Sequence, residues 1–304
     1  MGIVASLLFL GVAALPMYAS AQQSAKADLV RERVTCEASL CTGPVMAFIH
    51  GIWGSRSTWL NPLTGKTWPQ LVLEDRNFKD FDVYRLDYES KFFALGPQPK
   101  GSDIGRAVFE VLRPTLARYS KVYLIGHSMG GNLIRHYLVL LKASTPGPPA
   151  GPGHKVLEPY THGIFFLGTP VEGARIAEIG KHLNPDPALR ALLPIDVNDY
   201  LTFLNDAWGR ADHCDQDAPI GVVCRTVLTL GKALRVYAVC EEKPFAVSGL
   251  PTPILVVSRD SATALDPLEA KCFNRDHSTL VKPKDTTDPV YDWVKVRVLG
   301  LPRQ

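Results

Sequence analysis

The sequence predicts an α/β fold with a mainly parallel central sheet flanked by helices. Short apolar runs alternate along the chain with segments of helical periodicity, which is the order that a parallel sheet requires. The chain has 304 residues, 46% of them hydrophobic, and this suits one large domain, since some folds exceed ~250 residues as a single unit. The third observation is Ser128, which lies near Gly126 and Gly130 where a predicted strand turns into a predicted helix.

Five apolar runs have the length and composition of buried strands. Each run is short, and a turn-forming or helical segment separates it from the next. The expected strands are 44–49, 81–87, 121–125, 162–167 and 252–257.

Helices are predicted between these strands and after the last one. Residues 103–119 have helical spacing and an Asp near the start, although Pro114 must kink or interrupt that helix. From Met129 the apolar residues return at helical intervals. A closing helix is predicted at 288–299, because Asp288 is a suitable cap and the Pro that follows it suits a first helical turn.

The predicted domain spans 44–304 and follows an N-terminal extension at 22–43. The Pro- and Gly-rich residues 144–153 predict a connecting loop. Residues 171–250 are longer than one crossover needs, and we expect a helical insertion or cap there. Within it, 199–208 place Tyr, Phe, Leu, Ala and Trp side chains on one helical face. That face either contacts the core or covers a site.

Residues 1–21 have the pattern of a secretory signal peptide. An apolar, uncharged run at 3–15 precedes Ala-Ser-Ala at 19–21, which predicts cleavage before Gln22. A basic first segment is missing. Pro16 and the short run argue against a spanning helix, which needs ~20 apolar residues. We therefore expect a secreted or periplasmic protein, with an N-terminal membrane anchor as the alternative.

The six cysteines favour disulfide bonds, because an even number in an exported chain is typical of oxidised proteins. Their spacing lacks the pattern of a zinc site. Six cysteines allow 15 pairings, of which local pairing is the simplest. It would join Cys36 to Cys41, Cys214 to Cys224, and Cys240 to Cys272.

The net charge is +3, and the Lys and Arg residues are scattered. Such a distribution is typical of an ordinary solvated surface and gives no basic run for nucleic acid. No P-loop, dinucleotide-binding glycine pattern or metal-ligand cluster is present in the sequence, so we expect no cofactor.

Ser128 has the surroundings of a catalytic nucleophile. The G-x-S-x-G pattern between a strand and a helix forms a sharp turn that exposes the serine hydroxyl, and side chains at the two glycine positions would collide. The Met129 backbone N–H then faces the oxyanion that forms during attack, and the helix dipole favours that charge. A tight structural turn is the alternative interpretation.

A serine nucleophile needs a base, and the base needs a carboxylate to orient it. In this arrangement the chain order is serine, acid, histidine. Among the eight histidines, His277 follows the last predicted strand and precedes the final helix. Asp260, just past the strand at 252–257, is the expected acid. The rival acids are Asp266, Glu269 and Glu172.

The second oxyanion donor is expected after the strand at 44–49. Gly51 lets the backbone turn toward the substrate, so the Ile52 N–H is the expected donor, with Trp53 as the alternate. A glycine turn that merely ends the strand is the other interpretation.

Four blocks, "FIHGIWGSRSTW", "LIGHSMGG", "FLGTP" and "VVSRDSAT…DHSTLVKP", together resemble the serine esterase and lipase branch of the α/β-hydrolases. The resemblance covers roughly residues 44–300. It implies Ser128 as nucleophile, His277 as base and an acid within the "VVSRDSA" block, which favours Asp260. Val171 departs from the pattern, because relatives carry a His there.

The sequence therefore predicts hydrolysis of carboxylic esters through an acyl-enzyme intermediate. A lipase, a soluble carboxylesterase and a phospholipid or glycolipid deacylase all fit, and contact with a membrane surface would come through the substrate. The alternative is a hydrolase-like protein that binds a lipid or a partner without catalysis.

Overall fold

A computed structural model describes residues 25–89, 100–144, 161–174, 198–212, 234–246, 252–265 and 268–300. The expected signal peptide, the loop at 144–153 beyond Ser144, and the pair Cys214–Cys224 lie outside these residues.

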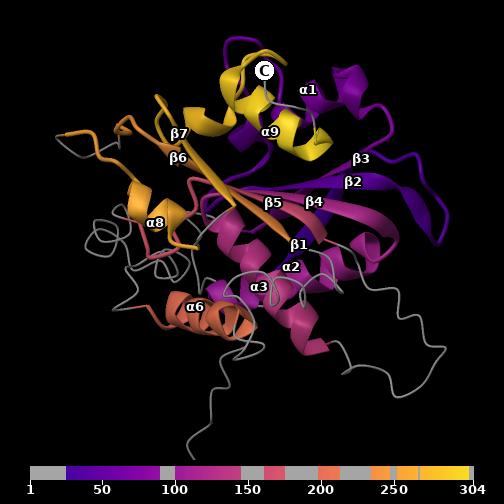
Figure 1. Ribbon diagram of the computed structural model, residues 1–304, viewed down its shortest axis with the longest axis horizontal. Helices are drawn as coiled ribbons and strands as arrows, with labels where there is room; N and C mark the ends of the chain where they lie inside the picture. Colours follow the sequence, from indigo (N-terminus) through magenta and orange to yellow (C-terminus); the bar gives the residue numbers. More distant parts are fainter. Residues whose placement is uncertain are drawn as a thin grey trace, which may run out of the picture.

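The described residues form one seven-stranded sheet in the order β1-β3-β2-β4-β5-β6-β7, as Figure 1 shows. All neighbouring strands are parallel except β1, which runs antiparallel to β3 at one edge. The strands are β1 Ala27–Arg33, β2 Cys41–Ile49, β3 Asp82–Tyr88, β4 Tyr119–His127, β5 Thr161–Leu167, β6 Arg235–Glu241 and β7 Glu269–Phe273. The mainly parallel α/β fold is thus confirmed.

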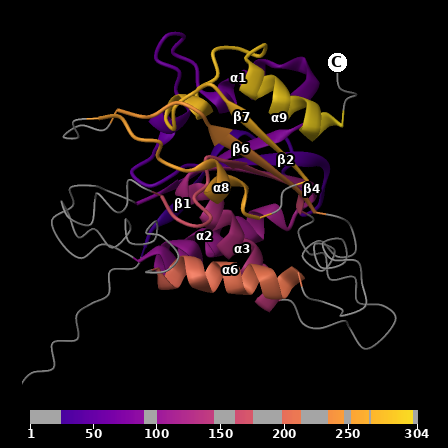
Figure 2. The same cartoon turned by 60° about the vertical axis from the view of Figure 1, so that its left-hand side comes forward.

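Helices cover both faces of the sheet (Figures 1 and 2). One face carries α1 and α9, and the other carries α2, α3 and α6, so each face buries its own apolar cluster. The helices are α1 Trp68–Glu74, α2 Gly101–Leu116, α3 Met129–Ser144, α6 Asp199–Asp212, α8 Arg259–Thr263 and α9 Pro289–Leu299; short 3₁₀ turns are η1 Arg56–Trp59, η2 Arg76–Phe78 and η4 Thr279–Val281.

The central strands are buried on both faces, which is why they are recognisable in the sequence as continuous apolar runs. Val45 to Ile49 in β2 and Val122 to Ile125 in β4 have almost no exposed surface. Pro114 lies in the last turn of α2, which ends at Leu116. Asp288 caps α9 through its side chain, as predicted.

The expected strand at 252–257 is wrong. This segment forms a single isolated bridge between Ile254 and Phe245 and otherwise runs as a loop. Prolines at 251 and 253 explain the difference, since proline cannot donate to a sheet ladder. The strands that follow β5 are β6 and β7, so the end of the region 171–250 belongs to the sheet.

Helix α6 packs against α3 through Leu201, Leu204 and Trp208, which are buried. Phe203, expected on the buried face, is 45% exposed. The helix therefore has the core contact that was one of the two interpretations of this face.

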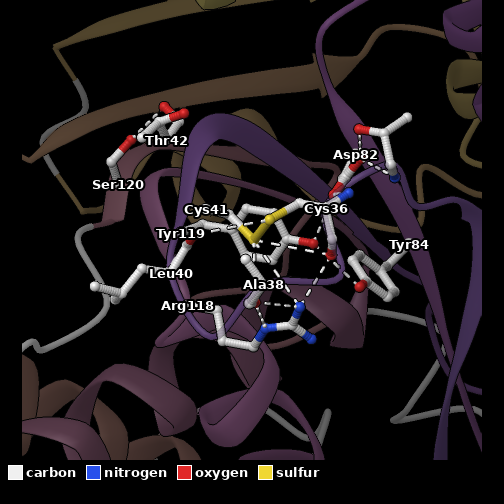
Figure 3. The surroundings of a disulfide bond; sticks show 11 residues. Cys36, Ala38, Leu40, Cys41, Thr42, Asp82, Tyr84, Arg118, Tyr119 and Ser120 are labelled. Carbon is white, nitrogen blue, oxygen red and sulfur yellow. Dashed lines mark hydrogen bonds between the residues drawn. A yellow bond between two sulfur atoms is a disulfide. The ribbon is translucent and has the colours of Figure 1, made fainter.

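Two of the predicted disulfides are confirmed, Cys36–Cys41 and Cys240–Cys272. Figure 3 shows the first, where the Arg118 guanidinium donates to the carbonyl oxygens of Cys36 and Ala38. Asp82 accepts bonds from the backbone N–H groups of Thr35 and Cys36. This cluster lies where β3 begins, at the amino edge of the sheet.

Candidate active site

Ser128 lies at a strained corner between β4 and α3. Its φ is +53°, a left-handed conformation that is unusual for a residue other than glycine. The flanking glycines are sterically required, because a Cβ at Gly126 would lie 2.6 Å from the Gly131 nitrogen and one at Gly130 would overlap the Ile49 carbonyl. The Ser128 N–H donates to the Leu167 carbonyl (3.0 Å), which fixes the corner against β5.

The loop after β2 lies directly against this corner. A Cβ at Gly51 would approach the Ser128 Cβ to 2.7 Å and its hydroxyl oxygen to 3.3 Å. Ile52 and Trp53 form the turn that follows, and Trp53 has a φ of +56°. On the other side, Met129 is the first residue of α3, where backbone N–H groups lack partners within the helix. Both predicted oxyanion segments thus flank Ser128.

His277 lies in the loop after β7 and is hydrogen-bonded to Glu241. The distance from its Nδ1 to Glu241 Oε2 is 2.5 Å, and the glutamate side chain has no exposed surface. Glu241 ends β6, and its other oxygen accepts a bond from the Val257 N–H (3.0 Å). A buried carboxylate held in this way fixes the orientation of the imidazole ring.

Asp260 is not the carboxylate that contacts His277, and this part of the prediction is wrong. Asp260 is exposed in the first turn of α8. Of its rivals, Glu269 pairs with Arg297 and Glu172 is exposed; Asp266 lies outside the described residues. The missed residue is Glu241, and the apolar run "VYAVC" before it was the signal for its strand.

Ser128 and His277 share neighbours at the carboxyl edge of the sheet. A Cβ at Gly168, which follows β5, would lie 3.2 Å from two atoms of the His277 ring. The same strand accepts the Ser128 N–H. Within the described contacts no hydrogen bond joins the Ser128 hydroxyl to His277. Such bonds often tighten only when substrate is bound.

A family model described as "Alpha/beta hydrolase family" matches residues 46–290, most of the chain. This chain belongs to the α/β-hydrolase family. The match includes the Ser128 corner, Glu241 and His277.

Solved structures show the same fold at low sequence identity. The mature form of the lipase BlEst2 from Bacillus licheniformis is 16% identical, with a TM-score of 0.51 over 88% of this chain and 98% of that one. Its propeptide form is 15% identical, with a TM-score of 0.53 over 91% of this chain and 54% of that one. Among curated proteins, none matches this sequence.

In this α/β-hydrolase His127 lies between the corner and the His277 loop. Its Nε2 is 3.0 Å from the His277 carbonyl oxygen, and the two imidazole rings are 4.7 Å apart. Because a carbonyl only accepts, Nε2 must carry the proton. Burial and the nearby His277 hold the His127 pKa well below its ordinary value, so this ring stays neutral.

His50 supports the loop on the other side of Ser128. Its ring stacks on Tyr88, with centroids 4.2 Å apart, and its Nδ1 is 2.7 Å from the Gly51 carbonyl oxygen. Burial lowers the His50 pKa to about 4. The Tyr88 hydroxyl donates to the His50 carbonyl (3.0 Å), so the carbonyl groups of His50 and Gly51 both have hydrogen-bond partners.

In the part of the chain that the structure describes, no group of three or more His, Cys, Asp or Glu side chains is arranged to hold a metal ion. Within the same residues, none of the helices combines the length and apolar character needed to cross a bilayer.

Proposed function

We propose that this protein hydrolyses carboxylic esters through Ser128, His277 and Glu241. The observation that carries the proposal is the buried Glu241 carboxylate on His277 Nδ1, in a chain that also holds Ser128 in a strained strand-to-helix corner. A carboxylate, an imidazole and an activated hydroxyl are the components of nucleophilic acyl transfer.

In the proposed reaction His277 Nε2 takes the Ser128 proton as the hydroxyl oxygen attacks the ester carbonyl. Glu241 keeps the ring in the tautomer with Nδ1 protonated and stabilises the imidazolium. The backbone N–H groups of Met129 and Ile52, or of Trp53 in place of Ile52, hold the oxyanion. His277 then protonates the departing alcohol, and water releases the acid from Ser128.

A fluorophosphonate probe tests the nucleophile directly, because it reacts with an activated serine. We expect labelling of Ser128 in the folded protein and none in Ser128→Ala. The same variant should lose at least ~10⁴-fold in kcat on p-nitrophenyl esters. Wild-type turnover in Ser128→Ala would overturn the assignment.

The competing function is a binding protein that keeps the fold without the reaction. It would bind esters or lipids, leave the probe unreacted and show no turnover across short to long acyl chains. The buried Glu241–His277 contact favours the enzyme, since burying a carboxylate costs free energy that a binding protein has no evident need to spend.

We also propose that the protein is exported, on the pattern of residues 1–21 and the disulfides Cys36–Cys41 and Cys240–Cys272. Export is tested by cell fractionation, followed by mass spectrometry to identify the N-terminal residue of the mature protein. A product that begins at Gln22 is expected. A full-length protein in the membrane fraction would instead indicate an N-terminal anchor.

A further inference from the structure

A cavity of about 1080 Å³ opens beside the loop after β2. Its walls come from the start of β1, the end of β3, the loop from His50 to Ser55, and one side of α2. The register of β1 on β3 pairs Ala27 with Tyr88 and Asp28 with Asp87. These residues therefore gather at the edge of the sheet where parallel strand β2 also ends.

The cavity adjoins the candidate nucleophile through a single loop. The cavity is lined by His50, Trp53 and Gly54. Gly51, which follows His50 in the same loop, lies directly against Ser128. An ester whose carbonyl is held at Ser128 can extend one substituent across this loop into the cavity.

The interior of the cavity is largely apolar. Trp53 and Tyr88 supply aromatic rings, and Ala27, Ala107 and Val111 supply small aliphatic surfaces. Such a lining, with a few polar groups, is typical of a small-molecule site. Aromatic faces also attract cations.

The rim of the cavity is acidic. Four carboxylates line it, and among the described lining residues Lys26 is the one cation. Asp87 is already paired with Arg85, but the other three, Asp28, Glu89 and Glu110, are exposed. This balance is opposite to that of the whole chain, whose net charge is +3.

We propose that this cavity receives a positively charged group, an ammonium or quaternary ammonium, carried by the ester substrate. The proposal rests on the ester hydrolysis proposed above. Apolar and aromatic walls accept the methylene or methyl groups of such a substituent, and the carboxylates favour its charge. A neutral acyl chain would fill the same walls but gain nothing from the rim.

Binding without turnover tests the cavity independently of catalysis. In Ser128→Ala, calorimetry would compare choline with its neutral isostere 3,3-dimethylbutan-1-ol. The structure predicts tighter binding of choline at low ionic strength, by roughly fivefold or more given the energies of exposed ion pairs and cation–π contacts. The preference should shrink with added salt, because salt screens exposed charges.

Kinetics on a matched pair of esters then tests the substrate class. Choline butyrate should have a higher kcat/KM than 3,3-dimethylbutyl butyrate. In Glu89→Gln/Glu110→Gln the ratio of the two kcat/KM values should fall at least about threefold. Glu37→Gln, an exposed change in the turn at the amino edge of the sheet, is the matched control and should leave the ratio as it is.

Equal binding of choline and its isostere would overturn the cavity proposal. An unchanged ratio of the two kcat/KM values in Glu89→Gln/Glu110→Gln would overturn it as well. Failure of the esterase itself is distinguishable: Ser128 would then resist the fluorophosphonate probe, while the calorimetric comparison would still decide what the cavity binds.

Discussion

Single residues around His277 decide whether the candidate site can work. Glu241 supplies the buried carboxylate on its Nδ1, and His127 supplies a hydrogen bond to its backbone carbonyl. Gly168, with φ +57°, leaves room for the ring. Glu241 contacts the imidazole ring and His127 contacts the backbone carbonyl of His277, so the two hydrogen bonds can be removed separately.

Glu241→Gln and Asp260→Asn, measured side by side, should separate the two carboxylates. We expect Glu241→Gln to lower kcat by roughly 10³–10⁴-fold, because the amide cannot stabilise the imidazolium. Asp260→Asn is an exposed change and should stay within about twofold. A large loss in Asp260→Asn alone would reverse the assignment. Steady-state ester hydrolysis provides both values.

His127→Phe should lower kcat about tenfold or more with little change in KM. The ring and its packing remain, but the buried His277 carbonyl loses its donor, at a cost of about 1–3 kcal/mol. His127→Gln, whose amide can donate from a similar position, should recover part of the rate. If KM and kcat change together in both variants, His127 is a packing residue rather than a positioning one.

At the scale of elements, the site depends on how β6 is attached to β7. Glu241 ends β6, and His277 follows β7 by four residues. Cys240, next to Glu241, is opposite Cys272 in the ladder, and the two are joined by a disulfide. This crosslink ties the strand that ends in Glu241 to the strand that leads to His277.

Loss of this disulfide should lower both stability and activity. Cys240→Ala/Cys272→Ala removes a crosslink across 32 residues and should cost about 3–4 kcal/mol in free energy of unfolding. Cys36→Ala/Cys41→Ala is the matched control at the amino edge, worth about 2 kcal/mol, and should keep its kcat. Urea unfolding and ester turnover measure both. Equal turnover in the two variants would contradict a role for β6–β7 attachment in catalysis.

For the whole molecule, the buried histidines make stability depend on pH. Burial lowers the pKa of His50 and of His136 to about 4 from an ordinary 6.5. Between these values the unfolded chain binds more protons than the folded one, so stability rises with pH across this window. His136 packs against Tyr200 of α6, and thus couples α3 to α6.

The melting temperature should fall as the pH is lowered from about 6.5 to about 4. Below that, protonation of Asp82 continues the loss: burial raises its pKa, but hydrogen bonds from Thr35 and Tyr119 outweigh this and lower it. His136→Gln removes one titrating group and should flatten the curve between pH 6.5 and 4. Calorimetry at several pH values would measure the melting temperature of the wild type and of His136→Gln. A melting temperature that stays constant between about pH 6.5 and about 4 would contradict the burial of these histidines in the neutral form.

The sequence by itself determined the α/β class, the strands around β4 and the Ser128 corner. These features are local: buried parallel strands are continuous apolar runs, and the corner needs glycines at fixed spacing. The tertiary structure decided which carboxylate contacts His277. Glu241 and Asp260 both follow apolar runs. Prolines exclude the run before Asp260 from the hydrogen-bonded ladder of the sheet. The run before Glu241 forms β6, which places Glu241 at the carboxyl edge of the sheet. Strand pairing between distant segments sets that contact, because no spacing along the chain specifies which strand lies beside β7.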